Sequence, residues 1–305
     1  MALIVKLALA PLAYYWPRRA VLDLYADVAE APVDVVYLGE TVCSRRHELR
    51  WPDWLDIAEL LAAHGKEVVL GTLALVEAEA DLRLLRKIVA QPRFRVEAND
   101  MAAVRLLAAR EAGPPFVAGA TLNVFGPGTL ALLHDAGASR WVAPPELAGA
   151  ALAALVAGAP AGMQTEVLAH GRLPLAHSAR CFTARHEELQ KDECDYRCIA
   201  HPDGLPLRTR EGQPFLTLNG VQTQSAATYS LLAELPALAA AGVDVVRVSP
   251  QAERTMDVLA LFRAVLDGAL DAAQAVVRSA ALAPGPLCNG FWHGRPGAEL
   301  VRAAA

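Results

Sequence analysis

The sequence lacks the features that mark several protein classes. It has no basic surplus, because its formal net charge is -5, and this argues against a dedicated nucleic-acid-binding protein, which usually carries a basic face. It also lacks the low hydrophobicity of a disordered chain, since 54% of its 305 residues are hydrophobic. We therefore expect a folded chain with a full-sized core and without DNA as a partner.

Targeting and membrane segments are also missing. Lys6 interrupts the apolar N-terminal stretch, and aromatic residues follow it in place of a small-residue cleavage site, so residues 1–12 are interpreted as a buried first strand. The longest uncharged stretch, between Glu146 and Glu166, is mostly alanine and glycine and contains Pro160. A spanning helix needs about 20 strongly apolar residues. We expect a cytoplasmic protein without a transmembrane segment.

The chain repeats one pattern, in which a helical segment is followed by glycine or proline and then by a short β-branched run. Glycine after a helix end supplies the left-handed cap, and the valine run is typical of a strand. The pattern recurs roughly every 25 to 35 residues, which is typical of βα units with parallel strands. About eight such units predict a single α/β domain over residues 1–305, a (β/α)8 TIM-barrel-like fold, with a doubly wound sheet as the alternative.

Helices are expected at the amphipathic segments between these runs. In Asp53–His64, the apolar positions leave Asp56 and Glu59 on the outside, which is typical of a helix that covers a sheet. The predicted helices are Arg18–Ala29, Asp53–His64, Glu77–Val89, Asp100–Ala112, Pro127–Asp135, Pro145–Ala157, Ala226–Ala241 and Thr255–Val276.

Residues 166–224 break this rhythm. They contain no long apolar helix and are rich in His, Arg, Cys, Pro and Gly, which predicts an irregular insertion late in the chain. A long irregular insertion in a compact domain is usually functional. This one carries three of the five cysteines.

The cysteines are the most informative residues. Their odd number, in a chain expected to be cytoplasmic, argues against a disulfide framework. Three of them fall within 18 residues as C-x12-C-x3-C, and such clustering in a reducing compartment indicates metal or redox chemistry. Cys288 stands alone and is interpreted as a small buried residue. The other four are Cys43, Cys181, Cys194 and Cys198.

Barrel topology can bring these four cysteines together. Cys43 follows a predicted strand, and the carboxyl ends of barrel strands open on one face, where sites are built. Four thiolates can hold a [4Fe–4S] cluster or a tetrahedral zinc ion. The absence of a C-x2-C knuckle favours the cluster, with zinc and unligated thiols as alternatives. Cys194-x3-Cys198-x2-His201 also resembles the radical S-adenosylmethionine pattern, but it lacks the third thiolate.

Polar residues near the cysteines are further candidates. Glu40 is a candidate acid–base group or an anchor for its loop, and Asn219 is a candidate substrate contact or a turn residue. Arg45 and Arg46 can bind a carboxylate through two bonds, or balance charge at a cluster or at the surface. A basic lining that suits a dicarboxylic donor, or a solvated loop, is predicted from His170, His177, Arg180, Arg185 and His186.

Several stretches resemble one known family. Residues 37–46, with the pattern Tyr-x-Gly-Glu-x-x-Cys-Ser-x-Arg, and the late C-x12-C-x3-C array are similar to the collagenase-like peptidase family of the U32 type. Within it, residues 13–17, 179–185 and 288–294 resemble the UbiV-like branch. The chain has neither a Gly-x-Ser-x-Gly elbow nor a His-Glu-x-x-His zinc helix, so its residues give the peptidase name little support.

The resemblance implies a role in oxygen-independent ubiquinone biosynthesis. It implies hydroxylation of the aromatic ring of the prenylated precursor, with prephenate as oxygen donor, by a heterodimer with a UbiU-like subunit and with help from a sterol-carrier-like lipid-binding protein. It also implies a [4Fe–4S] cluster on Cys43, Cys181, Cys194 and Cys198. Hydroxylation without O₂ needs electron transfer, which ordinary side chains do not supply.

Three functions therefore stand as expectations. The first is a subunit of an oxygen-independent ring hydroxylase. The second is a non-catalytic scaffold subunit with a structural cluster. The third is hydroxylation of an RNA base, which relatives in the wider family perform, and the missing basic surplus counts against it.

Overall fold

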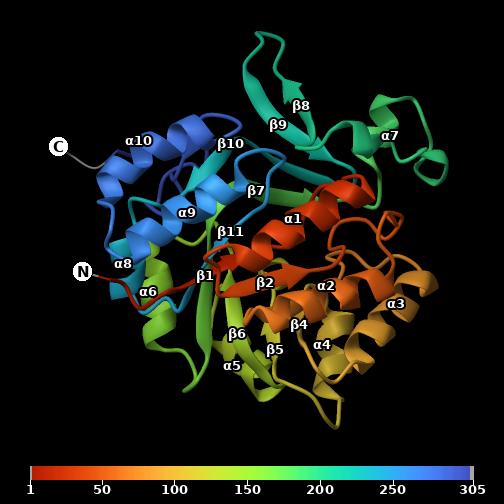
Figure 1. Ribbon diagram of the computed structural model, residues 1–305, viewed down its shortest axis with the longest axis horizontal. Helices are drawn as coiled ribbons and strands as arrows, with labels where there is room; N and C mark the ends of the chain where they lie inside the picture. Colours follow the sequence, from red (N-terminus) through yellow and green to blue (C-terminus); the bar gives the residue numbers. More distant parts are fainter. Residues whose placement is uncertain (1, 303–305) are drawn as a thin grey trace.

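The computed structural model describes residues 2–302, and its centre is a closed barrel (Figure 1). Parallel strands run in the order β11-β1-β2-β3-β4-β5-β6-β7, and β7 pairs with β11 to close the ring. This confirms the predicted (β/α)8 TIM-barrel-like fold and excludes the doubly wound sheet. The barrel strands are β1 (Lys6–Leu9), β2 (Val35–Leu38), β3 (Glu67–Gly71), β4 (Arg95–Ala98), β5 (Phe116–Ala118), β6 (Ala138–Ala143), β7 (Gln164–His177) and β11 (Val245–Val248).

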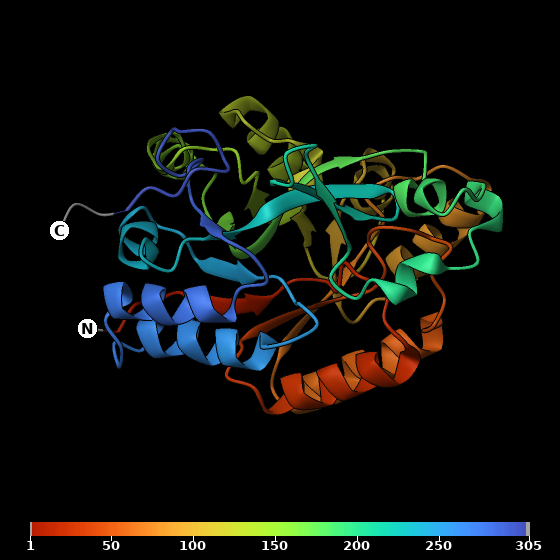
Figure 2. The same ribbon diagram turned by 90° about the horizontal axis from the view of Figure 1, so that it is seen from above.

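Helices surround the barrel, and α9 packs beside α10 along one flank (Figure 2). Within residues 2–302, no helix combines the length and apolarity that crossing a membrane requires. The helices are α1 (Arg18–Glu30), α2 (Trp51–Ala63), α3 (Glu79–Ala90), α4 (Met101–Ala108), α5 (Pro127–Asp135), α6 (Gly149–Ala157), α8 (Leu235–Ala240), α9 (Thr255–Leu266) and α10 (Ala272–Leu282), with a 3-10 turn η1 at Ala120–Leu122.

Two predicted helices differ from the structure. The helix expected at 226–241 begins as strand β10 (Gln222–Ser230), and only α8 is helical there. Its alanines favour a helix, but pairing with β7 and β9 outweighs that local preference. The helix expected at 255–276 is two helices, because Gly268 adopts a φ of 73° and ends α9.

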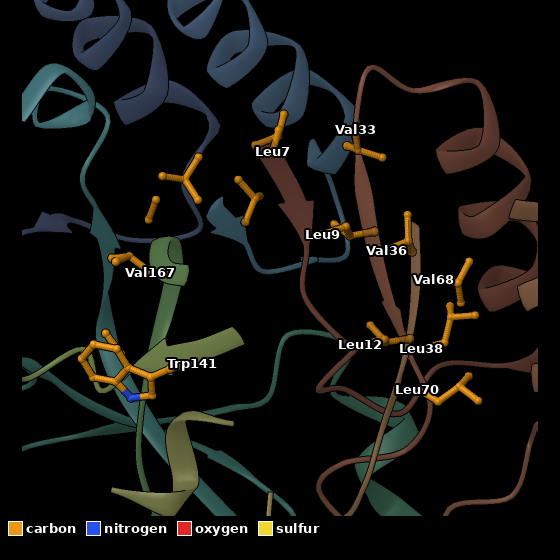
Figure 3. Close-up of a cluster of buried hydrophobic side chains, with 14 of the residues drawn as sticks. Leu7, Leu9, Leu12, Val33, Val36, Leu38, Val68, Leu70, Trp141 and Val167 are labelled. Atoms are coloured by element: carbon orange, nitrogen blue, oxygen red, sulfur yellow. The ribbon is translucent and has the colours of Figure 1, made fainter. Parts of the chain in front are cut away.

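The strands bury side chains on both faces. Residues that alternate along each strand point toward the helices and form the larger apolar layer, in which Figure 3 shows Leu7, Leu9, Val36 and Leu38. The intervening residues fill the barrel interior. The apolar part of this interior consists of Ala8, Val35, Tyr37, Val69, Val117, Val142 and Val245.

The barrel interior also contains a paired ionic network. Tyr37 Oη donates to Glu166 Oε2 at 2.5 Å, and Arg247 Nε donates to Glu166 Oε1 at 2.6 Å. The Arg247 guanidinium lies 3.9 Å from the centre of the Tyr37 ring, and its Nη2 is 2.8 Å from Glu97 Oε1 at an angle too poor for a hydrogen bond. Burial alone would lower the pKa of Arg247, but Glu166 and Glu97 outweigh it and raise the pKa. The charges are thus tolerated because they are paired.

A second, antiparallel sheet extends from the barrel. Strand β7 continues past the ring and pairs with β10, which pairs with β9, and the β8–β9 hairpin projects from the molecule (Figure 1). Residues 166–224 therefore differ from the irregular insertion predicted, since much of this segment is strand. Its remaining elements are α7 (Phe182–His186), η2 (Lys191–Glu193), η3 (Arg197–Ala200), β8 (Leu205–Arg208) and β9 (Pro214–Asn219), and β12 (Leu287–Cys288) pairs with β10.

In this extension, the distribution of polar and apolar residues is the reverse of that in an ordinary surface sheet. Cross-strand partners share a face, and the polar face is the buried one. It carries Thr217, Asn219, Gln222 and Gln224. The opposite face carries Leu205, Leu207, Leu216 and Leu218, all at least partly exposed. Buried polar residues in place of the usual apolar ones explain why sequence periodicity did not reveal β10, although a strand was predicted near residues 215–218, where β9 lies.

Candidate metal centre

The four clustered cysteines line one cavity. They come from separate places: Cys43 lies in the loop after β2, Cys181 precedes α7, Cys194 follows η2, and Cys198 lies in η3. Each is partly buried and unpaired. The barrel and its extension thus bring thiols that are distant in the sequence to a single site.

Glu40 organises the loop that carries Cys43. Its Oε1 accepts hydrogen bonds from the backbone N–H groups of Val42 and Cys43, each at 3.0 Å. Gly39, with a φ of 108°, allows the chain to turn there, because a Cβ at this position would lie 3.1 Å from Gly71 O. The contacts of Glu40 are those of the loop anchor that the sequence offered as one of its two interpretations.

Three side-chain contacts tie the late cysteine segment to the barrel loops. Arg45 donates to Asp192 through Nη1 to Oδ1 at 3.0 Å and through Nη2 to the backbone oxygen at 2.6 Å. Lys191 Nζ donates to Glu77 in the loop before α3. Trp16 Nε1 donates to Pro202 O at 2.6 Å. These contacts hold the segment over the loop of Cys43.

The turn between Cys194 and Cys198 is strained. Asp195 and Tyr196 adopt φ values of 47° and 52°, in the left-handed region that costs a residue with a Cβ roughly 1–2 kcal/mol. The Tyr196 ring packs edge-on against His47, with centroids 4.7 Å apart. This packing holds the turn in a shape that places both thiols on the cavity.

Burial and the charge of Arg46 have opposite effects on the pKa values of two of the thiols. Burial raises the pKa of Cys43 to about 11, with Arg46 opposing the shift and the Cys181 thiol adding to it. Burial also raises the pKa of Cys198, again against Arg46. Ligation requires thiolates, so a metal at this site must displace these protons.

The cavity lining fits a cluster held by thiolates. It offers four cysteine sulfurs and four cations, and none of its side chains is a carboxylate. Soft thiolates are the usual ligands of iron–sulfur clusters, and the cations offset their negative charge. Nε of Arg45 and Nε of Arg46 are buried without a hydrogen-bond partner within residues 2–302, which leaves two N–H donors for sulfur. The lining cations are Arg45, Arg46, Lys191 and Arg197.

A single metal ion needs a tighter ligand set than these thiols provide. Within residues 2–302, no set of three or more His, Cys, Asp or Glu side chains is arranged to hold one ion.

Asn219 lies next to the site but is occupied by protein contacts. Its Oδ1 accepts from Arg46 Nη2 at 2.6 Å, and its Nδ2 donates to Ala13 O at 2.7 Å. Gly220 follows it with a φ of 63° and opens the two-residue turn from β9 to β10. These contacts make Asn219 a support for Arg46.

The predicted basic lining is not the observed one. Arg180 and Arg185 are exposed, and neither lines the cavity. The interpretation of His170 as a lining residue was wrong, because it is fully buried with its ring against Phe262. Lys191 and Arg197 were missed, although their positions three residues before Cys194 and one before Cys198 offered a signal.

Two further hollows lie nearby. A narrow cavity of about 20 Å³ shares Arg46 with the thiol cavity, and its aromatic lining consists of Tyr14, Tyr15, Trp16 and Trp54. A surface groove of about 530 Å³ lies between α1 and the start of α9. Trp16 lines both hollows, so its indole stands between the groove and the aromatic cavity.

Comparisons with known proteins give one family. The model of peptidase family U32 matches residues 22–302. Among solved structures, the U32 peptidase Mk0906 is 14% identical, with a TM-score of 0.46 over 82% of this chain and 94% of that chain. The tryptophan synthase complex from Pyrococcus furiosus is 13% identical, with a TM-score of 0.44 over 88% of this chain and 100% of that chain.

Proposed function

We propose, starting from the fact that this chain belongs to peptidase family U32, that it is a [4Fe–4S] protein of the UbiV-like branch. Its cluster ligands are Cys43, Cys181, Cys194 and Cys198. It acts as a subunit of an oxygen-independent hydroxylase on the aromatic ring of ubiquinone precursors. The family match supports the first step, and the motifs at residues 13–17, 37–46, 179–185 and 288–294 support the branch.

One observation carries the cluster assignment. Four thiols from separate segments line one cavity together with four cations and two unpartnered N–H donors. A fold that needed these cysteines only as small apolar residues would bury them separately, as it buries Cys288. The donor set suits an anionic iron–sulfur cluster.

The side chains around the cavity hold the cysteine-carrying segments in place. Glu40 holds the Cys43 loop, and Arg45 docks the late cysteine segment through Asp192. When bound, the cluster supplies the electron transfer that hydroxylation without O₂ requires. The surrounding side chains exclude water and supply positive charge.

The surface groove beside Trp16 supports a prenylated aromatic substrate, because it offers about 530 Å³ of space, whereas the aromatic hollow next to it offers about 20 Å³. Aromatic side chains pack well against another ring, and Trp16 lines the groove. We assign the precursor to this groove. Prephenate is the proposed oxygen donor on the strength of the family resemblance.

The leucine face of the extension supports a protein partner. Leu207 is 40% exposed, its neighbours Leu205, Leu216 and Leu218 are partly exposed, and a cluster of exposed apolar residues is typical of an interaction site. We assign this face to the UbiU-like subunit of a heterodimer. The sterol-carrier-like lipid-binding protein is proposed, again from the resemblance, to deliver the prenylated substrate.

A complementation experiment tests the function. A bacterium that has lost its own oxygen-independent ring hydroxylation is supplied with this chain, with the UbiU-like subunit, or with both, and its ubiquinone is measured with and without oxygen. We expect ubiquinone without oxygen only when both chains are present. A loaded chain that never restores synthesis would contradict the hydroxylase role, and restoration by a variant without cluster ligands would favour a scaffold.

A further inference from the structure

Arg46 joins three segments of the fold at the edge of the thiol cavity. Its Nη1 donates to Ala13 O at 2.6 Å, after β1, and its Nη2 donates to Asn219 Oδ1 at 2.6 Å, at the end of β9. Nη1 also lies 3.5 Å from Glu40 Oε1. The guanidinium is therefore fixed by the barrel and by the extension together.

The same side chain faces the thiols. Arg46 and Cys198 line the same cavity, and the Arg46 Nε is buried without a partner within residues 2–302. Only 2% of its side chain is exposed, against 25% for Lys191, 34% for Arg45 and 54% for Arg197. Each of these cations has a carboxylate within 4 Å, which is Glu40 for Arg46, so Arg46 differs from the others in that water screens its charge least.

We propose that Arg46 is a positioning residue that holds the Cys198 sulfur and raises the reduction potential of the cluster, an inference that rests on the proposed cluster. Reduction adds one electron to an already anionic group. A buried cation that also donates to a ligand sulfur stabilises the reduced form more than the oxidised one. In this chain the donor is fixed before the cluster arrives, because Ala13 and Asn219 already hold it.

The test compares two arginines of unequal burial. The full chain, Arg46→Gln and Arg197→Gln are loaded without air, reduced stepwise with dithionite, and followed by electron paramagnetic resonance at set potentials. At a fixed potential, we expect Arg46→Gln to lower the ratio of reduced to oxidised cluster about tenfold, which is about 59 mV for one electron. Arg197→Gln removes the same charge from an exposed position, and we expect a change within about twofold. Equal shifts in the two variants would overturn the proposal.

A third variant separates charge from placement and covers a failure to fold. Arg46→Lys keeps the positive charge but lacks the fork that binds Ala13 and Asn219 together and leaves Nε free at the thiol cavity. We expect the ratio to fall by about threefold, with an altered resonance line shape. A potential and spectrum like those of the unaltered chain would overturn the proposal, even if Arg46→Gln cannot be purified. An unaltered chain without a reducible cluster would contradict the proposed function itself, whereas a cluster indifferent to Arg46 would contradict only this inference.

Discussion

The barrel interior and the thiol cavity both bury arginine, but the groups that surround the arginine differ between the two sites. In the interior, Arg247 forms salt bridges with Glu166 and Glu97. The Tyr37 ring beneath its guanidinium donates a hydrogen bond to Glu166 through its hydroxyl group. At the cavity, Arg45 pairs with Asp192 and Arg46 lies 3.5 Å from Glu40, but both carboxylates are outside the lining, and within residues 2–302 each arginine keeps an unpartnered Nε.

The difference indicates two purposes. The interior network pairs the Arg247 charge with two carboxylates, although its Nη2 makes no hydrogen bond within residues 2–302. The cavity combines unpartnered arginine N–H donors with thiols of raised pKa and with a strained turn at Asp195 and Tyr196, features that cost stability and that a bound anionic group would compensate.

The largest expected effect is at the thiols. Cys181→Ala should abolish cluster binding and ubiquinone synthesis without oxygen, because it removes one of four ligands, while aerobic synthesis continues. Iron content and quinone extraction measure this. Cys288→Ala is the matched control, since Cys288 is fully buried away from the cavity and should keep both properties. Full anaerobic activity in Cys181→Ala would refute the assignment.

Breaking the interior network should cost stability and leave the thiols intact. Arg247→Leu leaves Glu97 buried without a cation and leaves Glu166 with only Arg140, 3.7 Å away, and breaking a buried pair costs about 3–5 kcal/mol. Urea unfolding measures the loss. Arg93→Leu removes an exposed pair with Glu59 and should cost at most about 1 kcal/mol. Similar losses for both variants would contradict the contrast.

Acid should destabilise the fold through His170. Burial lowers its pKa to about 4 from its usual 6.5, so between these values the unfolded chain binds a proton that the folded chain does not. Stability from this residue is therefore present above pH 6.5 and falls by about 3 kcal/mol on reaching pH 4. His170→Leu should remove this part of the acid loss, whereas the exposed control His64→Leu should retain it. Unfolding at pH 7 and pH 4.5 decides between them.

A smaller effect is expected at the leucine face. Leu207→Glu should weaken binding of the UbiU-like subunit about tenfold, or about 1.4 kcal/mol, because it places a charge where the partner would bury a leucine. Leu132→Glu changes an exposed leucine on α5 and should bind as the unaltered chain does. Titration calorimetry against the partner measures both. Equal affinities of the two variants would show that the interface does not lie on the leucine face.

Much of the barrel could be predicted from the sequence. Valine runs after glycine or proline predicted the parallel strands β2, β3 and β11, and apolar patterns predicted α1, α2 and α5 close to their observed bounds. These features depend on local spacing, which a sequence displays directly. The strand β10 was missed because its alanines favour a helix and only tertiary pairing overrides them.

The candidate site was only partly predictable. The four cysteines could be grouped by residue type, and Glu40 could be recognised as a loop anchor from its place before Cys43. The cations could not be ranked, because exposure decides their roles: Arg180 and Arg185 point to solvent, while Arg46 is buried by contacts with Ala13 and Asn219. Such contacts join residues far apart and leave no local pattern.

The measurement that tests the central claim most directly is the metal and sulfide content of the chain purified without air, together with its visible and paramagnetic resonance spectra. The account predicts iron and acid-labile sulfide in equal amounts, as one [4Fe–4S] cluster per chain that is lost in Cys181→Ala. Zinc without sulfide, or a chain that stays free of metal after reconstitution with iron and sulfide, would contradict it.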